Sequence, residues 1–309
     1  MRNTTTHMIR TYTLRLLLLL LLLLLSHANP CLAFSATPSS PSFLMHVDQT
    51  QPLTPPHGIN TPPAAYCPMV SVPCQIIQSH NNNFDQSPIT SIIKPPNVEA
   101  LYDWYVNQAN TPNADPSWAV VWPTAVALTQ HLLLNPQLVH NQTVVELGAG
   151  LGLVGLVAAA ACHAKSVTLT DREPWALQCA MATAACHSNW QQRVNGALLD
   201  WTRINQTNLA GQADVICASD VLYDGDTIQA LAQACQALAA PTGATLLLAD
   251  PQTERLPGAR DMLRQALTTQ GSFQIHELPP IVTPPASTMD GRDHVQRMQE
   301  PVVLIQCDL

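Results

Sequence analysis

Three alternating glycines after a short apolar run constrain this sequence more than any other feature. Residues 144–152 read Val-Val-Glu-Leu-Gly-Ala-Gly-Leu-Gly, and Gly155 follows inside an apolar stretch. Glycine lets a backbone turn tightly and approach a ligand closely. A helix that starts after such a turn offers unpaired N–H groups and a partial positive charge. We therefore predict a strand, a ligand-binding turn and a helix, in this order.

Short apolar runs alternate with helix-like segments from Val98 to the end of the sequence. The expected strands are 143–147, 166–170, 197–199, 214–218, 244–249, 273–277 and 302–307. The expected helices are 98–108, 123–134, 151–162, 174–186, 227–239 and 257–268. This alternation predicts the α/β class, with a Rossmann-like, doubly wound and mainly parallel seven-stranded sheet and helices on both faces.

The glycine turn allows two kinds of ligand and one interpretation without a ligand. Gly150-x-Gly152-x-x-Gly155 satisfies the dinucleotide-binding pattern, and Asp171 ends the next expected strand, where a carboxylate suits the hydroxyls of a ribose. Glu146, however, lies two residues before the first glycine, and a carboxylate beside a pyrophosphate is unfavourable. A turn that serves only the packing of the strand and helix is the third interpretation.

The complete acidic-x-Gly-x-Gly-x-Gly pattern resembles the first motif of the class I methyltransferases, which use S-adenosylmethionine (SAM). The resemblance implies SAM as the cofactor, with Gly148, Gly150 and Gly152 beside it. It also implies that Glu146 serves the methionine ammonium, directly or through water, and that Asp171 binds the ribose. The resemblance covers about residues 98–309.

Two tryptophans and an aspartate add to the expected cofactor site. Asp200 follows the third expected strand and resembles the acid that accepts a hydrogen bond from the adenine amino group. Its neighbour Trp201 would pack on the adenine, and Trp122 would form a wall of the pocket. The alternatives are an aspartate that faces solvent and tryptophans that fill the core.

A second motif resembles the seven-β-strand protein-lysine methyltransferases, a branch grouped with nicotinamide N-methyltransferase-like enzymes. The motif is Asp220-x-x-Tyr223 after the fourth strand, and Trp118–Pro123 and Asp250-Pro251 add to the likeness. It implies transfer of a methyl group to a lysine side chain of a protein. Asp220 would attract and orient the ammonium, and Tyr223 would contact the amine. The Gly-Arg expected after Asp250-Pro251 is replaced by Gln252-Thr253.

The charge of the expected domain suits a cationic acceptor. Residues 99–309 contain 19 acidic and 9 basic residues, a net of −10. Such a field attracts basic peptides and repels nucleic acid, although the aspartates after the fourth strand could equally form a solvated loop. We expect a protein substrate with a target lysine, no nucleic acid, no metal and a monomer. The alternatives are a small-molecule N- or O-methyltransferase and a non-catalytic SAM-binding protein.

The first 97 residues read as a leader and a spacer. Residues 1–15 carry three arginines and no acid, and ten leucines follow at 16–25, which is typical of a signal peptide that ends near residue 33. Residues 34–97 hold 12 prolines and few charges, so we expect a disordered spacer or a transit-like segment, and the domain at 98–309.

The leader predicts entry into the secretory route, with no stable membrane span after its removal. Ala33-Phe34 resembles the plastid-targeting leaders of diatoms and related algae. The expected destination is therefore the plastid of a secondary-plastid alga. The alternatives are the endomembrane system or the exterior, or a leader that stays in the membrane as a signal anchor. Nine cysteines without a CxxC pair do not indicate a metal site. Those at 162, 179, 186, 217 and 235 are expected to be buried and reduced.

Overall fold

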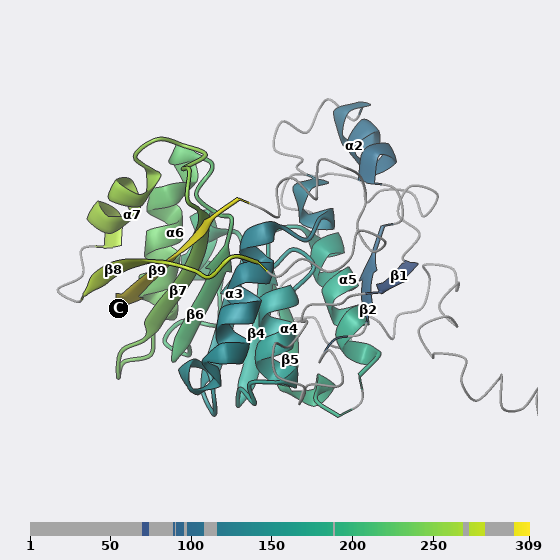
Figure 1. Cartoon of the computed structure of the whole chain (residues 1–309), viewed down its shortest axis with the longest axis horizontal. Helices are drawn as coiled ribbons and strands as arrows, with labels where there is room; N and C mark the ends of the chain where they lie inside the picture. The colour runs from purple at the N-terminus through teal and green to yellow at the C-terminus, as the bar shows by residue number, and fades with distance from the viewer. Residues whose placement is uncertain are drawn as a thin grey trace, which may run out of the picture. The chain divides into compact units, whose positions relative to one another are not determined.

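A seven-stranded sheet forms the centre of the described domain (Figure 1). The structure is a computed structural model that describes residues 70–73, 89, 91–95, 98–107, 116–187, 189–267, 272–281 and 300–309. The strands are β3 (Thr143–Leu147), β4 (Ser166–Asp171), β5 (Val194–Leu198), β6 (Val215–Ser219), β7 (Thr245–Pro251), β8 (Phe273–Glu277) and β9 (Val302–Asp308). Their order is β5-β4-β3-β6-β7-β9-β8.

Strands β3 to β7 run parallel, and β9 runs antiparallel to both β7 and β8. The prediction of a doubly wound, mainly parallel seven-stranded sheet is therefore confirmed. The chain passes from β3 outward to β4 and β5, and later returns to place β6 on the other side of β3. In open α/β sheets, ligands bind at such a reversal of strand order, outside the carboxyl ends of the strands.

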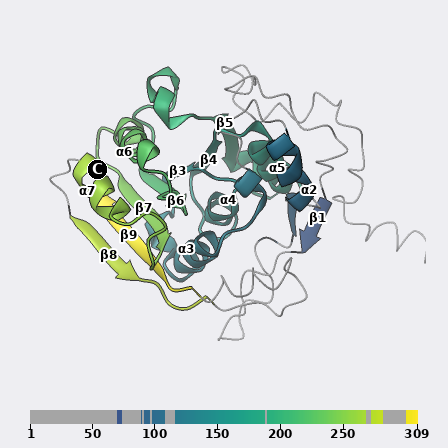
Figure 2. The ribbon, with the colours of Figure 1, turned by 90° about the horizontal axis from the view of Figure 1, so that it is seen from above.

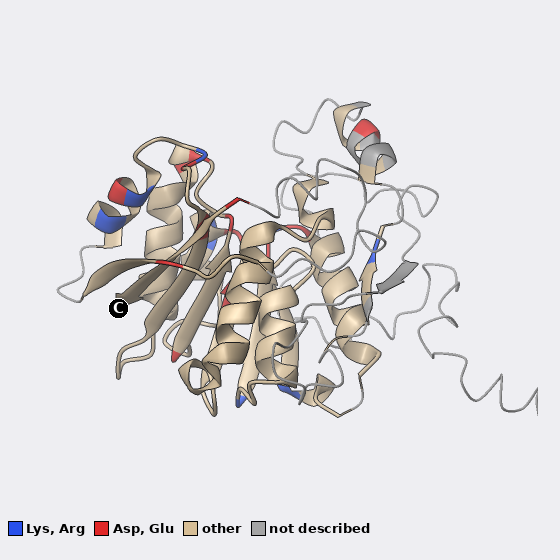
Figure 3. Cartoon of the chain, viewed as in Figure 1, with Lys and Arg blue, Asp and Glu red and all other residues tan. Residues whose placement is uncertain are grey.

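Helices cover both faces of the sheet (Figure 2). Three of them pack on one face and two on the other. The first three are α3 (Pro123–Leu134), α4 (Leu153–Ala160) and α5 (Pro174–Ala185), and the other two are α6 (Gly225–Leu238) and α7 (Ala259–Leu267). The helices α3, α4 and α5 contain no Asp, Glu, Lys or Arg (Figure 3).

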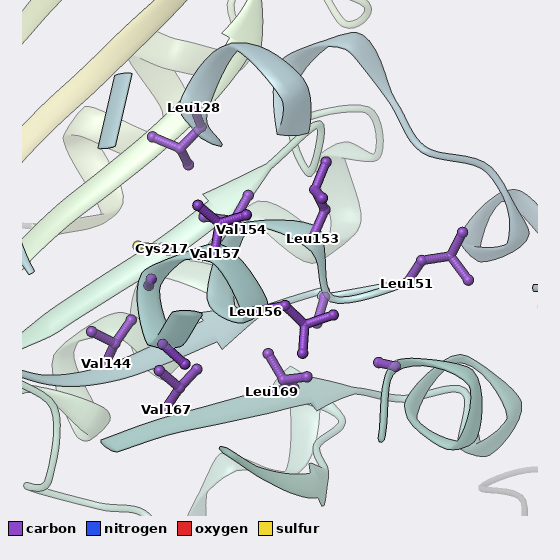
Figure 4. Close-up of a cluster of buried hydrophobic side chains, with 14 of the residues drawn as sticks. Leu128, Val144, Leu151, Leu153, Val154, Leu156, Val157, Val167, Leu169 and Cys217 are labelled. Atoms are coloured by element: carbon purple, nitrogen blue, oxygen red, sulfur yellow. The ribbon is translucent and has the colours of Figure 1, made fainter. Parts of the chain in front are cut away.

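Alternate residues of the strands belong to two separate apolar cores. In β3, Val144 packs with the core under α3, α4 and α5, and Val145 packs with the core under α6 and α7. This alternation is the two-residue period of a strand that is buried on both faces. Figure 4 shows part of the first core, in which Leu156 and Val157 of α4 belong to one cluster with Val144 and Val167 of the strands.

Several ends of helices and strands were predicted at the residue where the structure has them. Helix α3 has the predicted bounds, Pro123–Leu134, because proline at the first helical position needs no N–H partner. Helix α4, predicted from residue 151, begins at Leu153. The reason is that Gly152 has a left-handed φ of 75° and is the N-cap residue, so it cannot belong to the helix itself.

The few described residues before Val98 include two short strands, in a region where the sequence predicted a disordered spacer. Residues 70–73 and 91–94 form an antiparallel pair, β1 (Val70–Pro73) and β2 (Ser91–Lys94), and α2 (Val98–Asn107) follows. Ile89 and Ile92 are buried, and the N–H of Ile93 donates to Oγ1 of Thr183 at 2.8 Å. These residues therefore pack on the domain, and the rest of the predicted spacer stays a prediction. The leader at 1–33 and most of 34–97 lie outside the described residues.

The contact between β2 and α5 predicts a measurable loss of stability in Thr183→Val. Valine keeps the shape but removes the acceptor of the buried Ile93 N–H, so the free energy of unfolding should fall by about 1–3 kcal/mol. Urea unfolding measures this, with Thr245→Val as a control, since the Thr245 hydroxyl makes only an exposed 3.5 Å contact with Asp308. Equal stability of the two variants would show that β2 does not dock on α5.

The cysteines follow the prediction with one exception. Among the described residues, Cys162, Cys179, Cys217 and Cys235 are buried and form no disulfide. Cys186, at the end of α5, is instead half-buried and disulfide-bonded, so the prediction of a reduced thiol is wrong there. Disulfides persist mainly in oxidising compartments. None of the described helices is long and apolar enough to cross a membrane.

Candidate active site

A cavity lies at the carboxyl ends of β3, β4, β5 and β6, where the strand order reverses. Its lining includes residues from five segments that are distant in the sequence. These segments are 117–125, 148–153, 171–173, 199–202 and 219–227. Eight residues predicted for the site line this cavity: Trp122, Gly148, Gly150, Asp171, Asp200, Trp201, Asp220 and Tyr223. Glu146 and Gly152 do not line it.

The glycine turn between β3 and α4 has a backbone conformation and close neighbours that leave little room for side chains. Gly148 and Gly150 have φ values of 61° and 53°, in the left-handed region that favours glycine. A Cβ on Gly150 would lie 3.2 Å from the carbonyl oxygen of Trp118, and one on Gly148 would lie 3.4 Å from the Trp201 ring. The turn therefore places bare backbone against the cavity, as the sequence predicted.

Asp171 braces this turn from the end of β4. Its Oδ2 accepts the N–H of Gly150 at 2.8 Å, and its Oδ1 accepts the N–H of Glu173 at 2.9 Å. The carboxylate thus connects the two loops that form one side of the cavity. Its predicted contact with a ribose stays a prediction, and the geometry adds a second role, the support of the loops themselves.

Asp200 and Trp201 form the side of the cavity next to β5. Asp200 caps the short 3-10 helix η6 (Trp201–Gln206), because its Oδ1 accepts the N–H and the hydroxyl of Thr202 at 3.0 and 2.7 Å. Trp201 lies over Gly148, partly buried, and packs against the second core. The tryptophan therefore both fills core and lines the cavity, and its predicted packing on the adenine stays a prediction.

Glu146 lies beneath the turn instead of in the cavity. Its side chain is buried, with 2% of the residue exposed, and accepts the N–H of Gly155 in α4 at 2.8 Å. Burial raises the pKa of this carboxyl to about 8. The structure therefore shows Glu146 as a support of the first turn of α4, and its contact with a methionine ammonium stays a prediction.

Glu146→Gln should remove part of the pH dependence of stability. A carboxyl whose folded-state pKa is raised stabilises the fold below its ordinary pKa, and this contribution is lost as the pH rises through about 8. Glutamine stays neutral and can still accept the Gly155 N–H. Between pH 5.5 and 8.5 the urea midpoint should therefore fall in the wild type and fall less in the variant.

The burial of Glu173 contributes a second slope of the same sign, so the variant keeps some pH dependence. Identical slopes in the two proteins would show that Glu146 is ionised at neutral pH. The same variant tests the ammonium role, because a loss of SAM affinity of more than about tenfold would support it.

Asp220 and Tyr223 stand together at the end of β6. Asp220 has a left-handed φ of 56°, unusual for a residue other than glycine, and only 9% of it is exposed. Tyr223 is 47% exposed and lines the same cavity, so it lies where an acceptor from solution can reach it. The structure thus brings both predicted catalytic residues to one side of the cavity.

Arg255 is a partner of Asp220 that the sequence analysis missed. Its Nε and Nη2 donate to the two carboxylate oxygens of Asp220 at 2.6 and 2.7 Å, and its guanidinium lies over the ring of Trp122 at 5.1 Å. The two charged residues are 35 positions apart in the sequence, so no local pattern connects them. The Gly-Arg pair expected after Asp250-Pro251, in place of Gln252-Thr253, was the one available signal of an arginine near this strand end.

A second missed group connects helix α2 to the cavity. The hydroxyl of Tyr105 donates to Oε2 of Glu173 at 3.0 Å, and Nε1 of Trp118 donates to the Tyr105 oxygen at 3.3 Å. Trp118 and Glu173 both line the cavity, and burial raises the pKa of Glu173 to about 7. Helix α2 therefore belongs to the site, through a residue that the sequence gave no reason to select.

Comparison with known proteins identifies the family. The lysine methyltransferase family model matches residues 110–255. Protein N-lysine methyltransferase METTL21A of Danio rerio is 36% identical over 156 residues, which are 49% of this chain and 69% of that protein. This chain belongs to the lysine methyltransferase family. It is a SAM-dependent methyltransferase, as the glycine and Asp-x-x-Tyr motifs predicted.

Two further relatives differ in what their names say they act on. The electron transfer flavoprotein beta subunit lysine methyltransferase of Rattus norvegicus is 31% identical over 156 residues, covering 50% of this chain and 58% of that protein. Histone-arginine methyltransferase METTL23 of the same species is 32% identical over 112 residues, covering 36% of this chain and 49% of that protein. The chain thus spans about half to two thirds of these relatives.

The residues around the cavity fit SAM. The bare glycine backbone at Gly148 and Gly150 leaves space that a Cβ would fill, and carboxylates at Asp171 and Asp200 suit ribose hydroxyls and an adenine amino group. Trp201 offers an aromatic face at the same side. No group of His, Cys, Asp and Glu in the part of the chain that the structure describes could hold a metal ion.

Proposed function

We propose that this protein transfers the methyl group of SAM to a lysine side chain of a protein substrate. The observation that carries the proposal is the position of Asp220 and Tyr223 on the cofactor cavity at the end of β6. When bound, SAM supplies a methyl group on a sulfonium, which an in-line nucleophile can attack without a covalent enzyme intermediate. The protein therefore has to bind, orient and desolvate the acceptor.

The acceptor's protonation state is the main chemical obstacle. A lysine ammonium has an ordinary pKa of about 10.4, so removing its proton at neutral pH costs roughly 4 kcal/mol. A carboxylate at Asp220 attracts the ammonium and sets its direction, and Tyr223 offers a hydroxyl and a ring face to the amine. The proton can leave through water once the amine is held.

The charge of the domain supports a cationic substrate. The cavity lining includes Asp171, Asp200, Asp220 and Asp224 and also Glu173, and its only basic residue is Arg172. Such a field favours a basic peptide over an acidic one. It favours a lysine or arginine acceptor over a neutral small molecule, and it does not by itself choose between lysine and arginine.

Product analysis decides between these acceptors. The full chain is incubated with methyl-labelled SAM and a protein extract, and the labelled proteins are hydrolysed to amino acids. Label in methyl-lysine supports the proposal, and label in methylarginine or only in small molecules contradicts it. A heat-denatured sample is the control. Binding of SAM without any transfer would favour the non-catalytic alternative.

We further propose that the chain enters the secretory route and stays in its oxidising compartments or is secreted. The arginine-flanked leucine run at 16–25 and the disulfide at Cys186 support this, and the disulfide favours the endomembrane or secreted alternative over a reducing plastid stroma. A fluorescent fusion with and without residues 1–33 tests it. Import of the full-length fusion into the plastid stroma would contradict it.

A further inference from the structure

Arg255 touches two residues of the cavity wall without lining the cavity itself. Its guanidinium holds both oxygens of Asp220, and it lies over the face of Trp122. Asp220 and Trp122 line the cavity and Arg255 does not. About a third of its side chain is exposed (34%). Arg255 is therefore placed to act on the acceptor side of the cavity through other residues.

The Arg255 side chain fixes the direction of the Asp220 carboxylate. The backbone of Asp220 is itself strained. Asp220 adopts a left-handed conformation that costs energy for a residue with a Cβ, and its own N–H donates to the carbonyl oxygen of Ala249 at 3.0 Å. A bidentate guanidinium bond sets both the position and the plane of a carboxylate. Lysine, with one ammonium, cannot reproduce this geometry.

The loop that carries Arg255 is itself braced. The carboxylate of Glu254 accepts the N–H groups of Gly258 and Arg260 at 2.7 and 3.1 Å. Nε of Arg260 donates to Oδ2 of Asp250 at 2.8 Å, at the end of β7. These bonds join the loop to the sheet, so Arg255 projects from a supported segment.

From this geometry we infer that Arg255 is a positioning residue for methyl transfer. It orients the Asp220 carboxylate toward the acceptor and joins it to the Trp122 wall. The inference rests on the proposed function, which its assay uses. It assigns a role in methyl transfer to a residue outside the Asp-x-x-Tyr motif.

Arg255→Gln and Arg255→Lys test this in the full chain, with methyl-labelled SAM and the protein extract as the source of acceptors. Arg255→Gln should lower the initial rate of lysine labelling by at least about tenfold, whereas the Kd for SAM and the unfolding temperature stay close to the wild-type values. Arg255→Lys should recover part of the loss through one remaining contact. Arg264→Gln is the matched control, since Arg264 also lies over an aromatic ring, that of Phe273, but away from the cavity.

The double variant shows whether Arg255 acts through Asp220. In an Asp220→Asn background, Arg255→Gln should slow single-turnover labelling by less than about twofold. A further drop of tenfold would mean that Arg255 acts independently, and unchanged transfer in Arg255→Gln alone would overturn the inference. A loss that appears equally in the Kd for SAM would show a structural role. If the wild type itself labels no protein, the proposed function fails instead.

Discussion

Asp220→Asn is expected to lower methyl transfer by about 100-fold or more while SAM still binds. Asparagine has the size of aspartate and tolerates the left-handed backbone at this position, where φ is 56°. The variant therefore removes the negative charge and keeps the shape of the side chain. It loses the attraction for an acceptor ammonium and the two-bond pair with Arg255. A 100-fold loss of rate corresponds to about 2.7 kcal/mol of transition-state stabilisation.

Rates with labelled SAM and calorimetric titration of SAM measure the two effects separately. Asp261→Asn is the matched control, because Asp261 is exposed in the first turn of α7 and does not line the cavity. Transfer in Asp220→Asn at more than half of the wild-type rate would reject a catalytic role for this carboxylate. An equal loss of SAM binding would assign Asp220 to the cofactor instead of the acceptor.

The elements of this fold could be predicted because their signals are local. A strand buried on both faces is a short apolar run, and an uncharged helix such as α4 or α5 packs its side chains into the core against the sheet. Pro123 marks the start of α3 for a stereochemical reason that needs no tertiary contact. The glycine turn is equally local, since its left-handed φ values exclude most other residues.

The errors have a common physical origin in contacts that are distant in the sequence. Strand β2 is short and lies in a proline-rich, polar region, and the N–H of its Ile93 donates to Thr183, which is 90 residues away. Arg255 belongs to the site only because the end of β7 lies beside the end of β6. Composition averages over such a region and cannot show that one strand of it is docked.

Glu146 shows a different limit of the sequence. Its place in the motif was predicted, and the structure places it in β3, two residues before the first glycine of the turn. Its side chain, however, faces the N–H of Gly155, because the helix begins directly above it. A motif gives the position of a carboxylate along the chain, and packing decides which partner the carboxylate reaches.

Asp171→Ala should weaken SAM binding by about 100-fold without unfolding the domain. The variant removes a predicted ribose contact, and it also leaves the N–H groups of Gly150 and Glu173 without their acceptor. Each unpaired N–H costs about 1–3 kcal/mol, and the two loops that line the cavity lose their common support. The sheet keeps its hydrogen bonds, because Asp171 pairs with β5 through its backbone, which alanine retains.

Asp171→Asn is the informative companion to this variant. Its amide oxygen can accept one of the two N–H groups, whereas its NH₂ group faces the other donor, so its affinity should lie between those of alanine and the wild type. Calorimetric titration gives the Kd for SAM, and circular dichroism checks the fold. Affinity within threefold of the wild type in Asp171→Ala would show that neither the loops nor the cofactor depends on this carboxylate. An intact fold with the predicted order of affinities would instead show that one aspartate at the end of β4 shapes the turn as well as the pocket.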